Sequence, residues 1–148
     1  MTEKKSIWYW IVFALLTLWQ LPQFLVSLVM LPFLGKKTLV ADRHYNFCWK
    51  AEKMSGGISL GPFAYVSKSL SRREEYIAHE VDGHTVDSKR WGPLYLFVVG
   101  IPSILNAAFS FTSNYYDWYP EKWANKHAKL VAVGFGNYYV LRFEKNCK

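Results

Sequence analysis

The stretch Ser71–Trp91 reads SRREEYIAHEVDGHTVDSKRW and holds most of the side chains of this sequence that are suited to chemistry. Its first four residues form a capping-box pattern, in which the Ser71 hydroxyl accepts a hydrogen bond from a backbone N–H and the Glu74 carboxylate reaches back. Gly92-Pro93 follows the stretch, and the residue before a proline is disfavoured in the α region. The sequence therefore predicts one polar helix over residues 71–91, between two apolar runs.

Two histidines, His79 and His84, invite comparison with the zinc-protease pattern H-E-x-x-H, but they are five residues apart instead of four. At about 100° per residue, the two side chains lie roughly 140° apart around a regular helix, so they share an ion only if a bulge interrupts it. Glu80, His84 and Asp87 follow the spacing i, i+4, i+7 and share one face. A carboxylate, an imidazole and a second carboxylate suit Zn²⁺ or another divalent ion.

Polar side chains at helical spacing also occur on solvated faces that bind nothing. Two observations favour a site in this helix. Asp82, Glu80 and Asp87 concentrate negative charge that a cation would relieve, and ionisable groups between membrane-prone segments are costly unless they are paired or functional. Gly83 within a helix costs about 1 kcal/mol relative to alanine, so we expect another helix to pack closely against it.

Two apolar runs carry no formal charge, Ile7–Leu34 and Leu94–Phe111. A helix needs about 20 residues to cross a bilayer, so the first run is long enough to span. The polar step from Gln20 to Gln23, which contains Pro22, either kinks one spanning helix or turns the chain back as a re-entrant hairpin. We therefore expect a transmembrane helix over residues 7–34 and a second membrane-embedded helix over residues 93–111.

The amino-acid composition also favours a membrane environment. Aromatic residues make up 18% of the chain, and Trp and Tyr settle at membrane–water boundaries. The net charge of +7 lies largely in short basic groups that border the apolar runs, without a nucleic-acid recognition motif: Lys4-Lys5, Lys36-Lys37, Arg72-Arg73 and Lys89-Arg90. Cys48 and Cys147 are too few for a disulfide framework and lack metal-ligand spacing. The expected partner is a lipid bilayer, with no role for nucleic acid.

The remaining segments predict a single domain over residues 1–148. Two β-prone stretches within residues 44–67 predict a β-hairpin, in which Pro62 confines the second strand to an edge or a bulge. Such an edge strand would either capture an extended peptide or simply cover the membrane-proximal surface. Pro120 at a first helical turn predicts a third helix over residues 119–130, and the glycine-rich tail indicates a strand or an interfacial segment. The fold class expected is a mainly α membrane protein of α+β composition.

Three motifs resemble a family of small, largely uncharacterised bacterial membrane proteins. The family patterns are H-E-x-G-H-x-x-Q-S, then G-P-L-Y-L-x-x-x-G-x-P-S, then Y-Y-x-x-x-x-E-x-W-A. The matches are Glu80 with Gly83-His84 and Ser88, Gly92–Leu96 with Gly100–Ser103, and Tyr115-Tyr116 with Glu121–Ala124. The resemblance implies a metallopeptidase-like helix, with Glu121 as a third metal ligand.

This sequence departs from the family in the spacing of its histidines, and Asp87 stands where the family often has Gln. Either Glu80 occupies the first ligand position, or His79 does so with a bulge that absorbs Val81 or Asp82. The metal ligands expected are therefore Glu80, His84, Asp87 and Glu121. His79 and Asp82 are the expected catalytic or supporting residues, because a carboxylate that is not bound to the ion would act as the base.

The leading hypothesis is an integral protein of the cell membrane with a metal-dependent hydrolase or peptidase site for a peptide or protein substrate. The rival is a non-catalytic membrane structural or interaction protein, whose polar helix lies on the surface or pairs with a partner. A membrane-active effector is a third reading of the basic, aromatic composition. The first two differ in one geometric respect, because only the hydrolase requires Glu121 to fold back onto His84.

Overall fold

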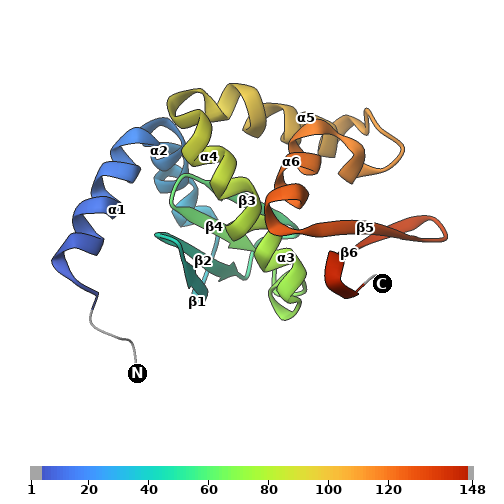
Figure 1. The fold of residues 1–148 in the computed structure, drawn as a ribbon, viewed down its shortest axis with the longest axis horizontal. Helices are drawn as coiled ribbons and strands as arrows, with labels where there is room; N and C mark the ends of the chain where they lie inside the picture. The colour runs from blue at the N-terminus through green and yellow to red at the C-terminus, as the bar shows by residue number, and fades with distance from the viewer. Residues whose placement is uncertain (1–4, 147–148) are drawn as a thin grey trace.

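The computed structural model describes residues 5–146 and shows an α+β fold, in which a four-stranded sheet packs against helical segments (Figure 1). Lys4 and Cys147 lie outside the described residues. The first half of the chain contains α1 (Ile7–Trp19), α2 (Leu21–Met30), β1 (Lys37–Arg43), β2 (Asn46–Ala51), β3 (Gly57–Leu60) and β4 (Phe63–Val66). The second half contains α3 (Glu74–Ala78), the π-helical η3 (His79–His84), α4 (Thr85–Trp91), the π-helical η5 (Leu96–Gly100), α5 (Ile101–Phe109), α6 (Tyr119–Ala128), β5 (Leu130–Phe135) and β6 (Tyr138–Phe143). Short 3-10 turns complete the chain: η1 (Leu31–Phe33), η2 (Leu70–Arg72), η4 (Gly92–Leu94), η6 (Tyr115–Asp117) and η7 (Glu144–Asn146).

The sheet has the strand order β1-β2-β4-β3, and other parts of the chain pack on both of its faces. Successive side chains of a strand point to opposite faces, and β4 shows this alternation. Ala64 and Val66 pack with Ile77 and Val81 of the α3–η3 segment. Tyr65 between them packs on the other side with a cluster that contains residues from the end of α2. One face of the sheet thus packs directly against the π-helical segment and helps to fix its position.

The two β-prone stretches of residues 44–67 lie side by side, but they do not form the predicted hairpin. β2 pairs in parallel with β4 and in antiparallel fashion with β1, whose residues were not expected to form a strand. The hairpin is formed within the second stretch, where β3 and β4 are joined at Gly61-Pro62. Gly61 has φ +67°, a conformation that glycine adopts without strain, so the chain reverses there and β3 becomes the edge strand.

The prediction of a mainly α membrane protein with one or two spanning helices is wrong, and the placement in the cell membrane is corrected with it. Within residues 5–146, no single helix is both long enough and apolar enough to cross a bilayer. The apolar run at the N-terminus is divided into Ile7–Trp19 and Leu21–Phe33, with a bend of 92° between them. In the second run, η5 and α5 together form one apolar helix, Leu96–Phe109, which is shorter than a bilayer span.

The bend follows from polar side chains within the first run. Gln23 Nε2 donates to Ser88 Oγ at 3.0 Å and to the Gly92 carbonyl at 2.9 Å, and Ser88 Oγ donates to Gln20 Oε1 at 2.6 Å. Both glutamines are fully buried, so these bonds hold the α1–α2 junction against the end of α4. α1 leaves apolar side chains such as Trp8 exposed, and contact between them and a lipid bilayer stays a prediction.

The polar helix is present but starts later than the capping-box pattern predicts. Ser71 Oγ donates to the Lys68 carbonyl instead of capping a helix, and Arg73 has an extended backbone, so α3 begins at Glu74. The other end agrees with the prediction, since α4 ends at Trp91. The third helix and the strand-forming tail are also where the sequence placed them, as α6 and the β5–β6 ribbon that projects to one side in Figure 1.

Candidate metal centre

His79 and His84 point toward the same place because the helix between them is not a regular α-helix. Residues His79–His84 form the π-helical segment η3, and the N–H of Thr85 donates to the carbonyl of Glu80, five residues earlier. Residues five apart lie near one another in a π-helix, whereas in an α-helix they point in different directions. The imidazole rings are 4.8 Å apart, at an angle of 86°. The bulge that the spacing requires is therefore present.

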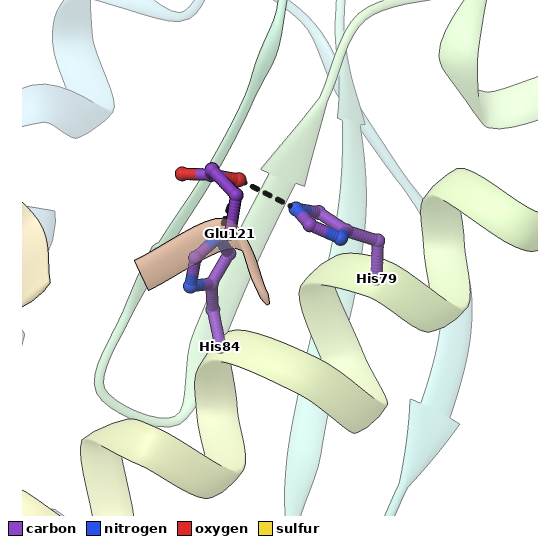
Figure 2. Close-up of side chains that lie close together, drawn as sticks. All are labelled: His79, His84 and Glu121. Atoms are coloured by element: carbon purple, nitrogen blue, oxygen red, sulfur yellow. Dashed lines mark hydrogen bonds and ion pairs between the residues drawn. The ribbon is translucent and has the colours of Figure 1, made fainter. Parts of the chain in front are cut away.

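The third member of the cluster, Glu121, comes from α6, which crosses directly over η3. Gly83 permits this approach, because a Cβ at that position would lie 2.6 Å from the Ala124 carbonyl oxygen and 2.9 Å from its Cβ. The expectation that another helix packs against Gly83 is thus confirmed. Figure 2 shows the result: Glu121 faces both histidines from the neighbouring element.

The two oxygens of Glu121 have different partners. Oε1 accepts hydrogen bonds from the hydroxyls of Ser103 and Tyr115, the latter at 3.0 Å. Oε2 lies 3.0 Å from His79 Nε2 and 3.3 Å from His84 Nε2. The Glu121 side chain is 0% exposed, and the histidine side chains are 5% and 7% exposed. Two imidazole nitrogens and one carboxylate oxygen therefore converge at a buried position, and these ligand atoms lie within 4.8 Å of one another.

The partners of the two ring nitrogens of His79 show why a cation suits this arrangement. Its Nδ1 lies 2.8 Å from Asn125 Oδ1, and an amide oxygen can only accept, so Nδ1 carries a proton. In the neutral ring, Nε2 would then face Glu121 Oε2 with one lone pair against another. Either a second proton or a metal ion between the two atoms removes this repulsion. The cluster of His79, His84 and Glu121 could therefore hold a metal ion.

The buried charges act on one another strongly. Burial alone would lower the pKa of His84, but the nearby Glu121 carboxylate and its hydrogen bond outweigh this effect and raise the pKa to about 9. Burial alone would raise the pKa of Glu121, but the charge of His84 and the bonds from both histidines hold it well below its usual range. Without metal, the site thus contains a carboxylate and a protonated imidazole at neutral pH.

Glu80 lies beside the cluster and is not part of it. Its Oε2 accepts a hydrogen bond of 2.6 Å from Ser59 Oγ in β3. The side chain is nearly buried and, together with His84, lines a cavity of about 350 Å³. Because the carboxylate is anchored at one oxygen, its other oxygen is available to a molecule in the cavity. The structure therefore favours His79 over Glu80 in the first ligand position.

Asp87 and Asp82, the other two carboxylates of the helix, are also outside the cluster. Asp87 Oδ1 lies 3.1 Å from His127 Nε2, while its Oδ2 is buried without a hydrogen-bond partner among the described residues. Asp82 is in an ion pair of 3.0 Å with Arg43 and does not line the cavity. The shared helical face that suggested Glu80, His84 and Asp87 as one site does not exist, because η3 changes the angular positions of these side chains.

Four residues in or near the site were not singled out from the sequence: Ser59, Ser103, Tyr115 and Asn125. Ser103 and Tyr115 stand in the quoted motifs but received no role there. Asn125 follows Glu121 by four residues, so a helical face shared by both was a signal for its position near the cluster. Ser59 had no such signal, because its contact with Glu80 depends on how β3 packs against η3.

Comparisons with protein-family models, with curated proteins and with solved structures found no significant match to this chain.

Proposed function

We propose that this protein binds a divalent metal ion, with zinc as the favoured ion, at His79, His84 and Glu121, and that it is a metal-dependent hydrolase acting on peptide bonds. The observation that carries the proposal is the convergence of both Nε2 atoms and Glu121 Oε2 in a buried cluster. Two imidazoles and one carboxylate are a common ligand set for catalytic zinc, which keeps one position open, whereas structural zinc is usually enclosed by four ligands.

The surroundings of the cluster support hydrolysis over a purely structural role. A bound ion of this kind polarises a carbonyl group and lowers the pKa of water. Glu80 is placed to accept a proton from an attacking water molecule and to pass it to the leaving group, because it is not held by the cluster and faces the cavity beside His84. Ser103 and Tyr115 hold Glu121 Oε1, which keeps Oε2 turned toward the histidines.

The rival hypothesis of a non-catalytic protein predicts a different arrangement of the polar side chains. It requires the polar side chains to face water or a partner, with Glu121 at a distance. The observed burial of all three cluster residues and the 3.3 Å between His84 and Glu121 favour the hydrolase hypothesis instead. Residues that only stabilise a fold would also not need a carboxylate in the wall of a cavity.

Zinc content tests the first step of the proposal. We expect about one zinc per chain in the purified protein, and a loss of affinity of at least about 10²-fold in His79→Ala and in His84→Ala. The exposed His44 provides a control, because His44→Asn removes an imidazole outside the cluster and asparagine tolerates its φ of 50°. Absence of zinc from the parent protein, or equal affinity in all three variants, would refute the metal site.

Hydrolysis tests the second step. Glu80→Gln should keep the zinc and reduce cleavage of a mixture of quenched fluorescent peptides by about 10²-fold or more, because the amide cannot accept the proton. Asp82→Asn, which changes the carboxylate two residues away, should leave cleavage nearly unchanged. A zinc-loaded protein that cleaves no peptide in this mixture would show that the site is not a peptidase.

A further inference from the structure

The cavity beside Glu80 and His84 has walls from three parts of the fold. Its apolar lining includes Val26 and Met30 of α2, Ile58 and Leu60 of β3, and Ile101 and Ile104 of α5. Its volume of about 350 Å³ lies within the range of pockets that bind small ligands or large side chains. Ile101 and Ile104 are about half exposed, so the cavity is reached from outside along α5.

One wall of this cavity is the free edge of the sheet. β3 pairs with β4 on one side only, and no other strand within residues 5–146 pairs with it. The hydroxyl of Tyr95, a cavity-lining residue, donates to the Ser59 carbonyl at 3.2 Å. One backbone acceptor of β3, the Ser59 carbonyl, therefore reaches a side chain of the cavity wall, and a peptide that pairs there would replace the Tyr95 hydroxyl as its donor. An edge of this kind pairs with an extended peptide by strand addition.

Glu80 lies over the same strand, on the face of the sheet toward which side chains at Gly57 and Ser59 point. A Cβ at Gly57, the first residue of β3, would lie 2.2 Å from Glu80 Oε1. The carboxylate therefore occupies the space that a side chain at this position would fill. A peptide paired with β3 would pass its backbone beside Glu80 and the cluster, while alternate side chains would point toward or away from the apolar walls.

We propose that β3 and the cavity bind an extended peptide, with one large aliphatic or aromatic side chain in the cavity and the adjacent peptide bond beside Glu80. This inference rests on the proposed function for the identity of the reacting bond, but the binding it describes does not require the metal. The unpaired side of β3 favours a peptide over a fatty acyl chain, because only a peptide has the backbone donors and acceptors that pair with a strand.

The side-chain preference is tested with peptides of the form acetyl-Ala-Ala-X-Ala-Ala-amide, where X is Gly, Leu or Phe. They are titrated calorimetrically into the whole chain, with and without added zinc. We expect the peptides with Leu and Phe to bind about tenfold more tightly, or better, than the peptide with Gly. Equal affinity for all three would overturn the proposal.

Two neighbouring alanines provide a matched pair of variants. Ala107 lines the cavity and Ala108 does not, and both are exposed, so either position accepts a larger side chain without disturbing the core. Ala107→Phe fills the cavity and should remove the preference for Leu and Phe, whereas Ala108→Phe should retain it. Retention of the preference in both variants would place the binding site elsewhere.

A backbone variant of the ligand tests the strand pairing. Methylation of the amide nitrogen on either side of X removes a donor and should weaken binding by about tenfold at one of the two positions. No effect at either position would refute pairing with β3, and stronger competition by decanoic acid than by the Leu peptide would identify an acyl-binding cavity instead. Because zinc content is measured separately, a chain that selects Leu peptides without binding zinc would refute only the proposed hydrolase.

Discussion

The Nε2 atom of His84 lies 3.3 Å from Oε2 of Glu121, a residue 37 positions later in the chain. Both side chains are buried, so their charges are not shielded by water. The interaction raises the pKa of His84 to about 9 against the opposing effect of burial. Without metal, the proton on His84 therefore partly neutralises Glu121, and a divalent ion would replace this proton.

This ion pair predicts how the stability of the metal-free protein depends on pH. The pKa of His84 is raised above its unfolded value of about 6.5, so its contribution is fully present below that pH and is lost as pH rises through about 9. We therefore expect the Tm in EDTA to fall between about pH 6.5 and pH 9. Thermal melts by circular dichroism measure this change.

The matching variant is His84→Gln, which keeps a polar side chain and has no ionisable group in this range. Its Tm should be lower at pH 6.5 than that of the parent protein and should change less toward pH 9. An identical decline in both proteins would mean that another group causes the pH dependence.

The close approach of α6 to η3 at Gly83 leads to the second prediction. Gly83→Ala places a Cβ 2.6 Å from the Ala124 carbonyl oxygen, so the two helices must separate. We expect a loss of about 1–3 kcal/mol in the free energy of unfolding, measured with urea, and weaker zinc binding because Glu121 moves with α6. Gly56→Ala is the control, since a Cβ there has no heavy atom within 4 Å. Similar losses in both variants would contradict the role of this contact.

The sequence predicted the location of the site better than its geometry. Glu121 was selected to meet His84 because the family resemblance implied it, and close packing at Gly83 was expected because a glycine within a helix is costly. The π-helical segment was only one of two alternatives. Residue spacing shows that a regular helix separates His79 from His84, but whether a bulge forms depends on tertiary packing of the sheet and α6 against that segment.

The membrane assignment failed for a related reason. A hydropathy pattern measures the polarity of a run and not its direction in space. Gln20 and Gln23 were noted as interruptions, yet their effect arises from hydrogen bonds to Ser88 and Gly92, which lie far away in sequence. A local pattern likewise could not predict that β2 pairs with β1 and β4. The parallel pair of β2 and β4 in particular requires a connection that returns the chain to the same end of the sheet.

Asp87 is the subject of the third prediction. Its Oδ2 and the Nδ1 of His84 are both buried without hydrogen-bond partners among the described residues, and the two residues are three apart along the chain. The two residues form no hydrogen bond with each other in the structure, but the charge of Asp87 acts on the His84 ring. A carboxylate near the outer nitrogen of a metal-binding histidine stabilises the ring in its metal-binding state. Asp87→Asn should therefore weaken zinc binding by about 10–100-fold.

Asp117→Asn is the control for this effect. Asp117 is exposed, and its ion pair with Lys122 is long, at 4.0 Å, so losing its charge should have little effect. Competition with a fluorescent zinc chelator measures the affinity of both variants. Equal zinc affinities in the two variants would show that Asp87 does not act on His84. Its interaction would then be with His127, whose Nε2 lies 3.1 Å from Asp87 Oδ1.

The fourth prediction concerns the extra residue of η3. Deletion of Asp82 shortens the distance between the two histidines from five residues to four, the spacing at which a regular α-helix places both on one face. The lost Arg43–Asp82 pair is half-buried and contributes at most about 1 kcal/mol. We therefore expect a folded protein with zinc affinity within about tenfold of the parent.

Deletion of Val86 from the regular helix α4 is the contrasting variant. It rotates the following residues by about 100° and displaces the buried Asp87 and Ser88, so we expect it to prevent folding. Circular dichroism and zinc titration distinguish the two deletions. A folded chain without Asp82 that no longer binds zinc would mean that the π-helical turn does more than align His79 with His84, because it would then also set their distance from Glu121.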